Sequence, residues 1–343
     1  MKQDSIGSLN ELEENLSNPT SGVVETLGRL DSDVLILGVG GKMGPSLSRM
    51  VRRGMDQAGV NRRVIGVSRF SSDKTRQQLE HWGIETIVCD LLNQNEVASL
   101  PEISHVIYMA GFKFGSSANP AMTWAMNCHT PALVSARFRN SRLVAFSSGN
   151  VYGLVNATTD GSVETDAPSP VGEYAITILG RERIFEYFSR RFQIPMALLR
   201  LNYATELRYG VLVDLARQIH QGKVIDLSMG YVNVIWQADA NANAIQMLEQ
   251  VSTPPEVINI AGSQILKVRD TCEQLAECMG KSVRFSGHEA TDALLSNAGK
   301  CISSFGNPQH ESDLMIRWTA NWVLQGGEHS GKPTHFSNRE GKF

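Results

Sequence analysis

The chain has 343 residues, 42% of them hydrophobic and 20% charged, and a formal net charge of −3. This composition is that of an ordinary globular protein, and so small a net charge gives no reason to expect general affinity for nucleic acid or an anionic membrane. The five cysteines form no CxxC pair, which favours reduced, buried, inert thiols and no metal site. Because no apolar run approaches the roughly 18 residues of a membrane span and no signal-peptide core is visible, we expect a cytoplasmic protein.

Residues 1–32 have the pattern of a helical N-terminal extension. Ser8 and Glu11 stand at capping-box spacing, and leucines follow at helical intervals. A break at Asn18-Pro19-Thr20 separates this segment from a second short apolar face. We expect the extension to pack on the outside of the main domain or against a partner subunit.

Short apolar runs alternate with amphipathic helical segments between residues 33 and 202. The apolar runs lie at 34–38, 63–67, 86–89, 105–110, 142–147 and 196–201, and the helical patterns near 43–57, 73–82, 119–139 and 174–192. Nearly continuous apolar strands that alternate with helices are typical of a parallel sheet covered on both faces. The pattern predicts an α/β fold with a Rossmann-type, doubly wound sheet.

The remainder of the chain has a more mixed pattern. We expect residues 203–330 to form a smaller C-terminal substrate lobe that partly returns to the main sheet, through a strand at 257–262 among others. Residues 331–343 form a polar tail. Fraying of this tail and docking of its two phenylalanines on another surface both remain open.

A glycine-rich turn follows the first apolar strand directly. Gly38, Gly41 and Gly44 recur at three-residue spacing, with Lys42 and Met43 between the last two. Such glycines permit a tight turn, close backbone approach to a pyrophosphate and close helix–strand packing, and the following helix offers free N–H groups to phosphates. With the strand before it and an amphipathic helix after it, the motif predicts a nucleotide cofactor site.

The end of the second strand indicates which nicotinamide cofactor is bound. An acidic residue there commonly holds the adenosine 2′-hydroxyl of NAD, but this chain has Ser68 and Arg69. A guanidinium attracts a 2′-phosphate, and Lys42 could assist it, so NADP is favoured and NAD remains possible. Asp90 and Leu91, at the end of the third strand, are candidates for contact with the adenine.

Several further segments occur in an order that resembles the extended short-chain dehydrogenase/reductase superfamily. The nearest group is the NAD-dependent epimerase/dehydratase family, whose members are similar to UDP-galactose 4-epimerase, and the resemblance covers about residues 33–262. The matching segments are the glycine turn, Tyr108–Lys113, Asn127, Phe146–Gly153, Glu173–Ala175, Leu199–Asn202 and Asp239.

The resemblance implies hydride transfer at a carbon that bears a hydroxyl or keto group. In such enzymes a tyrosine is the acid/base and a serine orients the same oxygen, which here would be Tyr174 and Ser148. By the same resemblance Ala110, Gly111, Lys113 and Asn127 belong to the cofactor site, and Asn150 and Asn202 face the substrate together with Ser148.

The chain departs from the family at the lysine expected four residues after the tyrosine, where it has Ile178. That lysine lowers the pKa of a phenol whose free value is about 10, and it also holds the nicotinamide ribose. Our hypothesis is that Lys113 substitutes for it. Arg181 and Arg183, on the same helix as Tyr174, are expected to be solvated.

A second departure concerns the substrate. Members that act on sugar nucleotides often carry an arginine seven residues before the aspartate matched by Asp239, and here that position is Val232. Either another arginine, such as Arg200 or Arg208, replaces it, or the substrate is not a nucleotide sugar.

The sequence therefore predicts an NAD(P)-dependent oxidoreductase or epimerase that acts on a carbohydrate-like small molecule, with NADP favoured. The alternative is a catalytically impaired cofactor-binding protein that acts as a sensor or scaffold. By resemblance we expect a homodimer, formed through the helices near 119–139 and 174–192.

Overall fold

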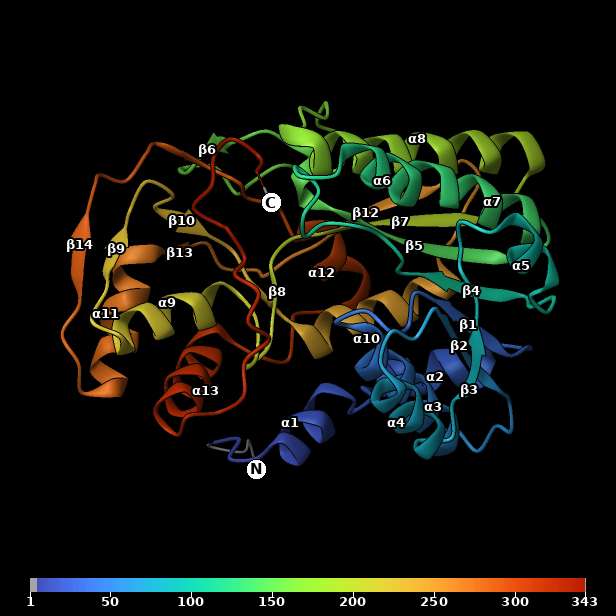
Figure 1. Cartoon of the computed structure of the whole chain (residues 1–343), viewed down its shortest axis with the longest axis horizontal. Coiled ribbons are helices and arrows are strands. Elements are labelled where there is room, and N and C mark those ends of the chain that lie inside the picture. The colour runs from blue at the N-terminus through green and yellow to red at the C-terminus, as the bar shows by residue number, and fades with distance from the viewer. Residues whose placement is uncertain (1–4, 343) are drawn as a thin grey trace.

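The computed structural model describes residues 5–342, and its centre is a seven-stranded sheet (Figure 1). The strand order is β12-β7-β5-β4-β1-β2-β3, and all neighbours are parallel. The strands are β1 (Val34–Leu37), β2 (Val64–Ser68), β3 (Glu85–Val88), β4 (His105–Tyr108), β5 (Arg142–Ser148), β7 (Met196–Leu201) and β12 (Glu256–Ile260). The chain moves outward from β1 to β3 and then resumes on the other side of β1, which confirms the doubly wound prediction and puts a crevice at the carboxyl ends of β1 and β4.

Helices cover both faces of this sheet. Leu35 and Leu37 point into one core and Ile36 into the other, as the two-residue period of a strand requires. Figure 1 shows α6, α7 and α8 on one side and α2, α3 and α10 on the other. The helices that flank the sheet are α3 (Gly44–Gln57), α4 (Asp73–His81), α5 (Gln94–Ser99), α6 (Pro120–Trp124), α7 (Thr130–Arg137), α8 (Gly172–Phe192) and α10 (Gln237–Gln246).

The N-terminal extension forms two helices, α1 (Leu9–Leu16) and α2 (Ser21–Arg29). The Ser8 side chain accepts a hydrogen bond from the Glu11 N–H and so caps α1. Helix α2 packs against α3 and α10, where Leu27 lies against the α-carbon of Gly54. The extension is therefore built into the face that carries the glycine-turn helix.

Residues 119–139 do not form the single helix that the sequence pattern predicts. Helix α6 leads into a π-helical turn over Ala125–His129, which continues as α7. The wider turn contains Asn127, whose side chain leaves the helix to bond the backbone of Phe112. A π-turn places one extra residue in the helix, and such turns are frequent at functional sites.

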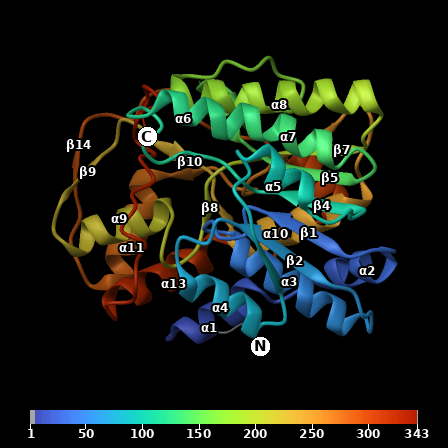
Figure 2. The same cartoon turned by 45° about the vertical axis from the view of Figure 1, so that its right-hand side comes forward.

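The smaller lobe is built on α9 (Val211–His220), α11 (Val268–Met279) and α13 (Ser312–Leu324), which pack on one another (Figure 2). Strand β12 leaves this lobe and joins the main sheet beside β7. Its other elements, with those of the loop after β5, are 3-10 turns at Gly149–Val151 and Met247–Glu249, helix α12 (Gly299–Phe305), and strands β6 (Val155–Asn156), β8 (Ala204–Thr205), β9 (Val224–Asp226), β10 (Tyr231–Val232), β11 (Ile235–Trp236), β13 (Leu266–Lys267), β14 (Arg284–Ser286) and β15 (Asp292–Ala293).

The described part of the polar tail is docked. Thr334 donates from its backbone N–H and its hydroxyl to the Asp214 carboxylate on α9, and Phe336 is buried. Further along, Arg339 pairs with Asp292, and the backbone of Gly341 lies against the first residue of α8. The tail thus crosses from the smaller lobe to the helix that carries Tyr174.

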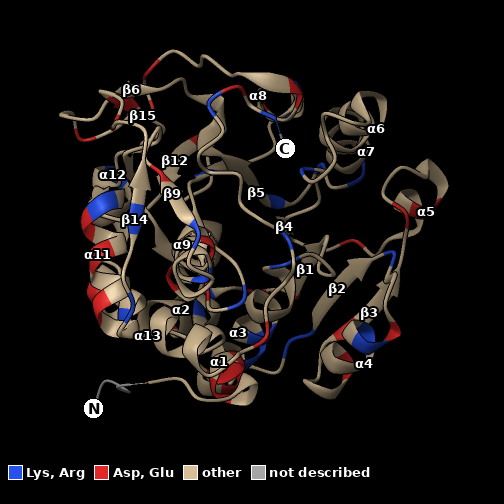
Figure 3. Cartoon of the chain, turned by 60° about the vertical axis from the view of Figure 1, so that its left-hand side comes forward, with Lys and Arg blue, Asp and Glu red and all other residues tan. Residues whose placement is uncertain are grey.

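On the face drawn in Figure 3, α4 carries two basic and two acidic side chains, whereas α11 carries one arginine and three acidic residues. Among residues 5–342, no helix combines the length and apolarity needed to span a membrane. Cys278 is exposed, so the expectation that all five thiols are buried is wrong for this residue.

Candidate active site

The glycine turn has two glycines that close it and one that stays open. Gly38 has φ +88°, and a Cβ there would lie 2.6 Å from the Ala110 backbone nitrogen. A Cβ on Gly44 would clash with the backbone of Val39, whereas at Gly41 the nearest atom would be 3.3 Å away. Gly41 is solvent-exposed, and no side chain among residues 5–342 caps the N-terminus of α3 with a hydrogen bond. An open backbone cradle at an uncapped helix end fits the pyrophosphate of a dinucleotide.

Lys42 leaves this turn toward the smaller lobe. Its Nζ donates to the Ala204 carbonyl at 3.1 Å and lies 3.8 Å from the centroid of the Tyr209 ring. Solvent still reaches the residue, yet the dense surroundings lower its pKa to about 7, with Lys113 adding to the effect and Glu206 opposing it. Met43 is the residue before α3, and its side chain packs on the hydrophobic core.

The residues expected to select the adenosine end lie at the same edge of the sheet. A Cβ on Gly40 would lie 2.6 Å from the Ser68 hydroxyl, which shows how closely the end of β2 approaches the glycine turn. Arg69 is exposed there and forms no ion pair with any described residue. Beyond β3, Leu91 is buried, and the Asp90 carboxylate accepts from the Leu92 N–H.

The segment after β4 passes next to the turn and is fixed by one amide side chain. Ala110 is buried against Gly38, and Gly111 follows as an exposed residue. Asn127 accepts from the Phe112 N–H at 2.9 Å and donates to the Phe112 carbonyl at 3.0 Å. The amide therefore satisfies a stretch of backbone that has no strand beside it.

The predicted acid/base and its partner meet at the carboxyl end of β5. The Tyr174 phenol lies close enough to Ser148 for this side chain to influence its pKa. Ser148 donates to the Asn150 amide oxygen at 2.9 Å and accepts from the Asn150 N–H at 3.2 Å. Burial raises the pKa of the Tyr174 phenol above its ordinary value, and Arg181 and Ser148 oppose this rise in part.

Lys113 also lies at this point. Its Nζ is 5.4 Å from the centroid of the Tyr174 ring, and burial lowers its pKa to about 8. Asn202 is only 2% exposed, and its amide nitrogen donates to the Asn233 side chain at 2.9 Å beside Gly149. The sequence predicts that Asn202 faces a substrate. In the structure this side chain is buried and already hydrogen-bonded to Asn233.

Ile178 is buried among apolar side chains of the loop after β5, so no polar group stands where the lysine was expected. The expectation of a solvated Arg181 is wrong. Arg181 is 4% exposed and donates to the Phe146 carbonyl at 2.9 Å and to the Asn127 amide oxygen at 2.8 Å. Arg183 is solvated, with its side chain 59% exposed and paired to Glu186.

A signal for Arg181 exists in the sequence. Tyr174, Thr177, Ile178 and Arg181 stand at positions i, i+3, i+4 and i+7, which share one face of a helix. Any helix that presents Tyr174 to the crevice also turns Arg181 toward the sheet. The residue was missed because only the i+4 position was compared with the family pattern.

Neither arginine offered as a substitute for Val232 is free to bind a diphosphate. Arg200 makes two hydrogen bonds, 3.0 and 2.9 Å long, to the buried Glu182 carboxylate. Arg208 pairs with Glu13 at 2.6 Å and with Glu206 at 3.1 Å. Val232 itself is buried in the core.

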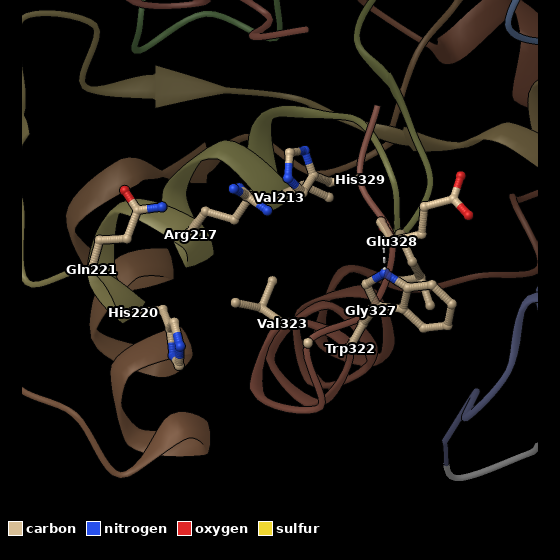
Figure 4. A pocket seen from close by; sticks show the side chains of 11 residues that line it. Val213, Arg217, His220, Gln221, Trp322, Val323, Gly327, Glu328 and His329 are labelled. Carbon is tan, nitrogen blue, oxygen red and sulfur yellow. Dashed lines mark hydrogen bonds between the residues drawn. The ribbon is translucent and has the colours of Figure 1, made fainter. Parts of the chain in front are cut away.

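Two cavities flank α9, outside the predicted site. One, of about 190 Å³, lies between α9 and the chain that follows α13, where Trp322 donates to the Glu328 carbonyl (Figure 4). The other, of about 330 Å³, lies between α9 and the docked tail. Arg217 and Gln221 of α9 line both cavities. The two cavities therefore lie on either side of the same face of α9, one toward α13 and one toward the docked tail.

The fold matches that of known proteins. UDP-glucuronic acid 4-epimerase from Bacillus cereus, in complex with UDP-glucuronic acid and NAD, superposes with a TM-score of 0.69 at 16% identity, over 85% of this chain and 99% of that one. UDP-glucose 4-epimerase from Thermus thermophilus, with NAD, gives 0.69 at 18% identity, over 86% and 99%. dTDP-glucose 4,6-dehydratase from Streptomyces venezuelae, with NAD bound, gives 0.71 at 15% identity, over 85% and 96%.

At such identities these structures establish the fold. No curated protein matches the sequence significantly. The sequence profile of the NAD dependent epimerase/dehydratase family, however, matches residues 34–261, which is most of the chain. Because this match covers more than half of the chain, the chain belongs to the NAD dependent epimerase/dehydratase family.

Proposed function

We propose that the protein catalyses reversible hydride transfer on a carbohydrate-like small molecule, as an NAD(P)-dependent epimerase, dehydratase or oxidoreductase. The observation that carries the proposal is the placement of Tyr174 next to Ser148 and below the Lys113 ammonium, in a fold whose glycine turn leaves an exposed backbone cradle. A dinucleotide would be held by Gly38, Gly41 and Gly44, with its nicotinamide end toward Gly111. When bound, the nicotinamide supplies the group that accepts or returns hydride.

The chain's own residues manage the proton. In its phenolate form Tyr174 takes the proton from the substrate hydroxyl as that carbon is oxidised, and the resulting phenol returns the proton in the reverse direction. Ser148 has one hydroxyl proton, so it donates either to Asn150 or to the oxygen that loses its proton, but not to both. Asn150 therefore holds Ser148 in place until the substrate oxygen competes for that proton.

Lys113 and Lys42 are proposed to bind anionic or hydroxyl oxygens of cofactor and substrate. Lys113 lies over the Tyr174 ring, and Lys42 leaves the glycine turn. Because Arg200 and Arg208 are held by carboxylates and Val232 is apolar, the proposal favours a substrate other than a nucleotide sugar.

NADP is the proposed cofactor form, because the end of β2 has Ser68 and the exposed Arg69 in place of a carboxylate. The solved proteins named above carry NAD, so the test is a paired titration. Purified protein freed of copurified cofactor is titrated with NADPH and with NADH, and nucleotide fluorescence is recorded. Tighter binding of NADPH than of NADH supports the role of Arg69. If Arg69→Ala no longer prefers NADPH, the preference is assigned to this arginine. Tighter NADH binding overturns the preference.

A homodimer is also proposed. Four exposed apolar side chains lie on α6 and α8, the helices through which dimerisation was expected. They are Met122, Trp124, Ile176 and Tyr187, which are 36%, 45%, 41% and 56% exposed. A cytoplasmic location stays a prediction from the sequence.

Turnover is tested with a panel of polyols, keto-sugars and sugar phosphates, with and without added cofactor. We expect at least one substrate to change the nicotinamide absorbance or to yield an epimer by NMR. We expect Tyr174→Phe and Lys113→Ala to lose that activity while staying folded. Tight cofactor binding with no turnover in any form would favour the second candidate, a sensor or scaffold, which the apolar Ile178 motivates.

A further inference from the structure

Helix α8 carries a buried cation one turn beyond the apolar Ile178. Arg181 has two donor groups in use, Nη1 to the Phe146 carbonyl and Nη2 to the Asn127 amide. Its Nε is buried without a hydrogen-bond partner. A guanidinium with this much burial is costly unless its charge is used, and no carboxylate forms an ion pair with it among residues 5–342.

We propose that Arg181 is a positioning residue that takes over the electrostatic role of the missing lysine, by holding a permanent positive charge beneath the Tyr174 phenol. The proposal rests on the function proposed above and divides the lysine's two tasks between two residues. Lys113 would make the contact with the cofactor ribose or the substrate, and Arg181 would supply the fixed charge.

The geometry favours this division. Tyr174 and Arg181 share one face of α8, and long helical side chains lean toward the N-terminus, so the guanidinium reaches back toward the tyrosine. The Phe146 carbonyl precedes Ser148 by two residues, and Asn127 fixes the segment after β4. Arg181 is therefore bonded directly to the backbone of β5 and, through the Asn127 amide, to the segment after β4.

Close packing fixes the charge at that point. A Cβ on Gly111 would lie 2.5 Å from Nη2 of Arg181, so only glycine leaves room for the guanidinium at its present position. The guanidinium carbon also lies 5.4 Å from the centroid of the Tyr108 ring. With two acceptors, a ring and the backbone of Gly111 around it, the guanidinium has little freedom to move away.

Chemistry distinguishes Arg181 from Lys113 as the charge donor. Burial lowers the pKa of Lys113 to about 8, so this lysine is partly neutral at the pH at which a phenol begins to ionise. A guanidinium stays protonated throughout that range. The attraction of Arg181 lowers the pKa of Tyr174 against the effect of burial.

The other titratable groups around Tyr174 do not supply that constant charge. Tyr209 and Tyr203 belong to the smaller lobe, and burial raises the pKa of both. Glu173, the neighbour of Tyr174 in the sequence, points outward and accepts from the Trp124 indole at 2.9 Å. Two cations interact with Tyr174, Lys113 with its ring and Arg181 with its phenol.

The test measures the phenol directly and needs neither substrate nor cofactor. Protein labelled with ¹³C at the ζ carbon of tyrosine is titrated by NMR between about pH 7 and 11. The Tyr174 resonance is assigned as the one absent from Tyr174→Phe. We expect the titration midpoint of Tyr174 in Arg181→Met to lie about one pH unit above that of the parent protein. If that midpoint lies above the measured range, the Tyr174 resonance of the variant should stay unshifted at the pH at which the parent resonance has begun to move. Arg181→Lys should restore part of the shift.

Controls separate the charge from a merely structural role. Arg183→Gln removes an exposed arginine from the same helix and should leave the midpoint unchanged. Gly111→Ala keeps the charge but displaces the guanidinium, and should move the midpoint in the same direction as Arg181→Met. Thermal unfolding followed by circular dichroism shows which variants are folded, and if Arg181→Met is not, Gly111→Ala and Arg181→Lys carry the test.

An unchanged Tyr174 midpoint in folded Arg181→Met, or in folded Gly111→Ala if the former does not fold, would overturn the proposal. If the Tyr174 midpoint shifts by about one pH unit in Lys113→Met and does not shift in Arg181→Met, the charge that acts on the phenol belongs to Lys113. Because these outcomes are read in the protein without cofactor, they stand apart from a failure to find a substrate, which bears on the proposed function alone.

Discussion

Asn127 and Arg181 share a hydrogen bond of 2.8 Å, and the same Asn127 oxygen accepts from the Phe112 N–H at 2.9 Å. The position of the segment after β4 thus depends on a cation carried by α8. Because a π-turn carries Asn127, its amide can leave the helix and reach both partners. The segment after β4, helix α8 and the π-helical turn are therefore joined through the Asn127 side chain.

Asn127→Ala should destabilise the protein by about 3 kcal/mol, because it leaves several buried partners without hydrogen bonds. Thr177→Val removes the bond that Asn127 donates to the Thr177 hydroxyl, 3.0 Å long, and the bond that this hydroxyl donates to the Tyr174 carbonyl, 2.9 Å long. It leaves the Phe112 and Arg181 bonds in place and should cost about 1–2 kcal/mol. Urea unfolding of the two variants measures both values. Equal costs would show that the Phe112 and Arg181 bonds add little.

Glu182→Gln should be strongly destabilising, by about 3–5 kcal/mol, because it leaves the Arg200 guanidinium buried without its counter-ion. The matched control is Glu186→Gln on the same helix. Glu186 pairs with Arg183 and Arg190, both more than half exposed, so its loss should cost less than about 1 kcal/mol. Denaturant midpoints compare the two, and similar values would contradict the assignment of Glu182 as the buried anchor.

Gly41→Ala and Gly44→Ala should separate cofactor binding from folding. Ala at Gly44 clashes with the Val39 backbone and should lower the melting temperature strongly, whereas Ala at Gly41 meets the Gly38 carbonyl oxygen at 3.3 Å and should lower it much less. Only the open face of Gly41 approaches the proposed pyrophosphate, so its variant should lose nucleotide binding while folded. NADPH fluorescence and thermal unfolding report the two properties. Undiminished binding by Gly41→Ala would mean that the cofactor does not approach this backbone.

Affinity for the cofactor should fall as the pH rises from about 6 to 9. The pKa values of Lys42 and Lys113 are about 7 and about 8, below the usual value of about 10.4, and only the protonated forms attract phosphate. NADPH titrations across this range measure the effect, and Lys42→Met should flatten it. A flat profile in the parent protein would exclude both lysines from the anion site.

The same pKa values make a separate prediction for the free protein. Below pH about 7 both lysines are protonated in the folded and in the unfolded state. The burial of their charges then lowers the free energy of unfolding by its full amount. Between about pH 7 and 10.4 the unfolded chain binds more protons, so this contribution makes the protein more stable as the pH rises. The difference between parent and Lys42→Met in unfolding free energy should therefore shrink over that window.

Tyr187→Glu should weaken the proposed homodimer, because it puts a charge on an exposed apolar position of α8. Leu324→Glu, on an exposed apolar position at the end of α13, is the control. Analytical ultracentrifugation gives the masses of both. A monomeric parent protein, or a Tyr187→Glu dimer as stable as the parent, would exclude this face as the interface.

The amino-acid sequence by itself determined the alternation of strands and helices and the glycine turn, because both follow from local periodicity. The φ of +88° at Gly38 is a requirement of a tight turn after a buried strand, and neighbouring residues already indicate it. The order of the motifs likewise indicated that Ser148, Tyr174 and Gly111 belong to one crevice. The proximity of Lys113 to Tyr174 followed from the same order.

Only the tertiary structure decided which charged side chains are buried. Arg181 finds its acceptors 35 and 54 residues away in the chain, and Arg200 finds Glu182 18 residues away, across the gap between sheet and helix. A charge is buried when such partners meet it in space, and a single sequence does not show these meetings. The docking of Thr334 on Asp214, 120 residues apart, was undetermined for the same reason.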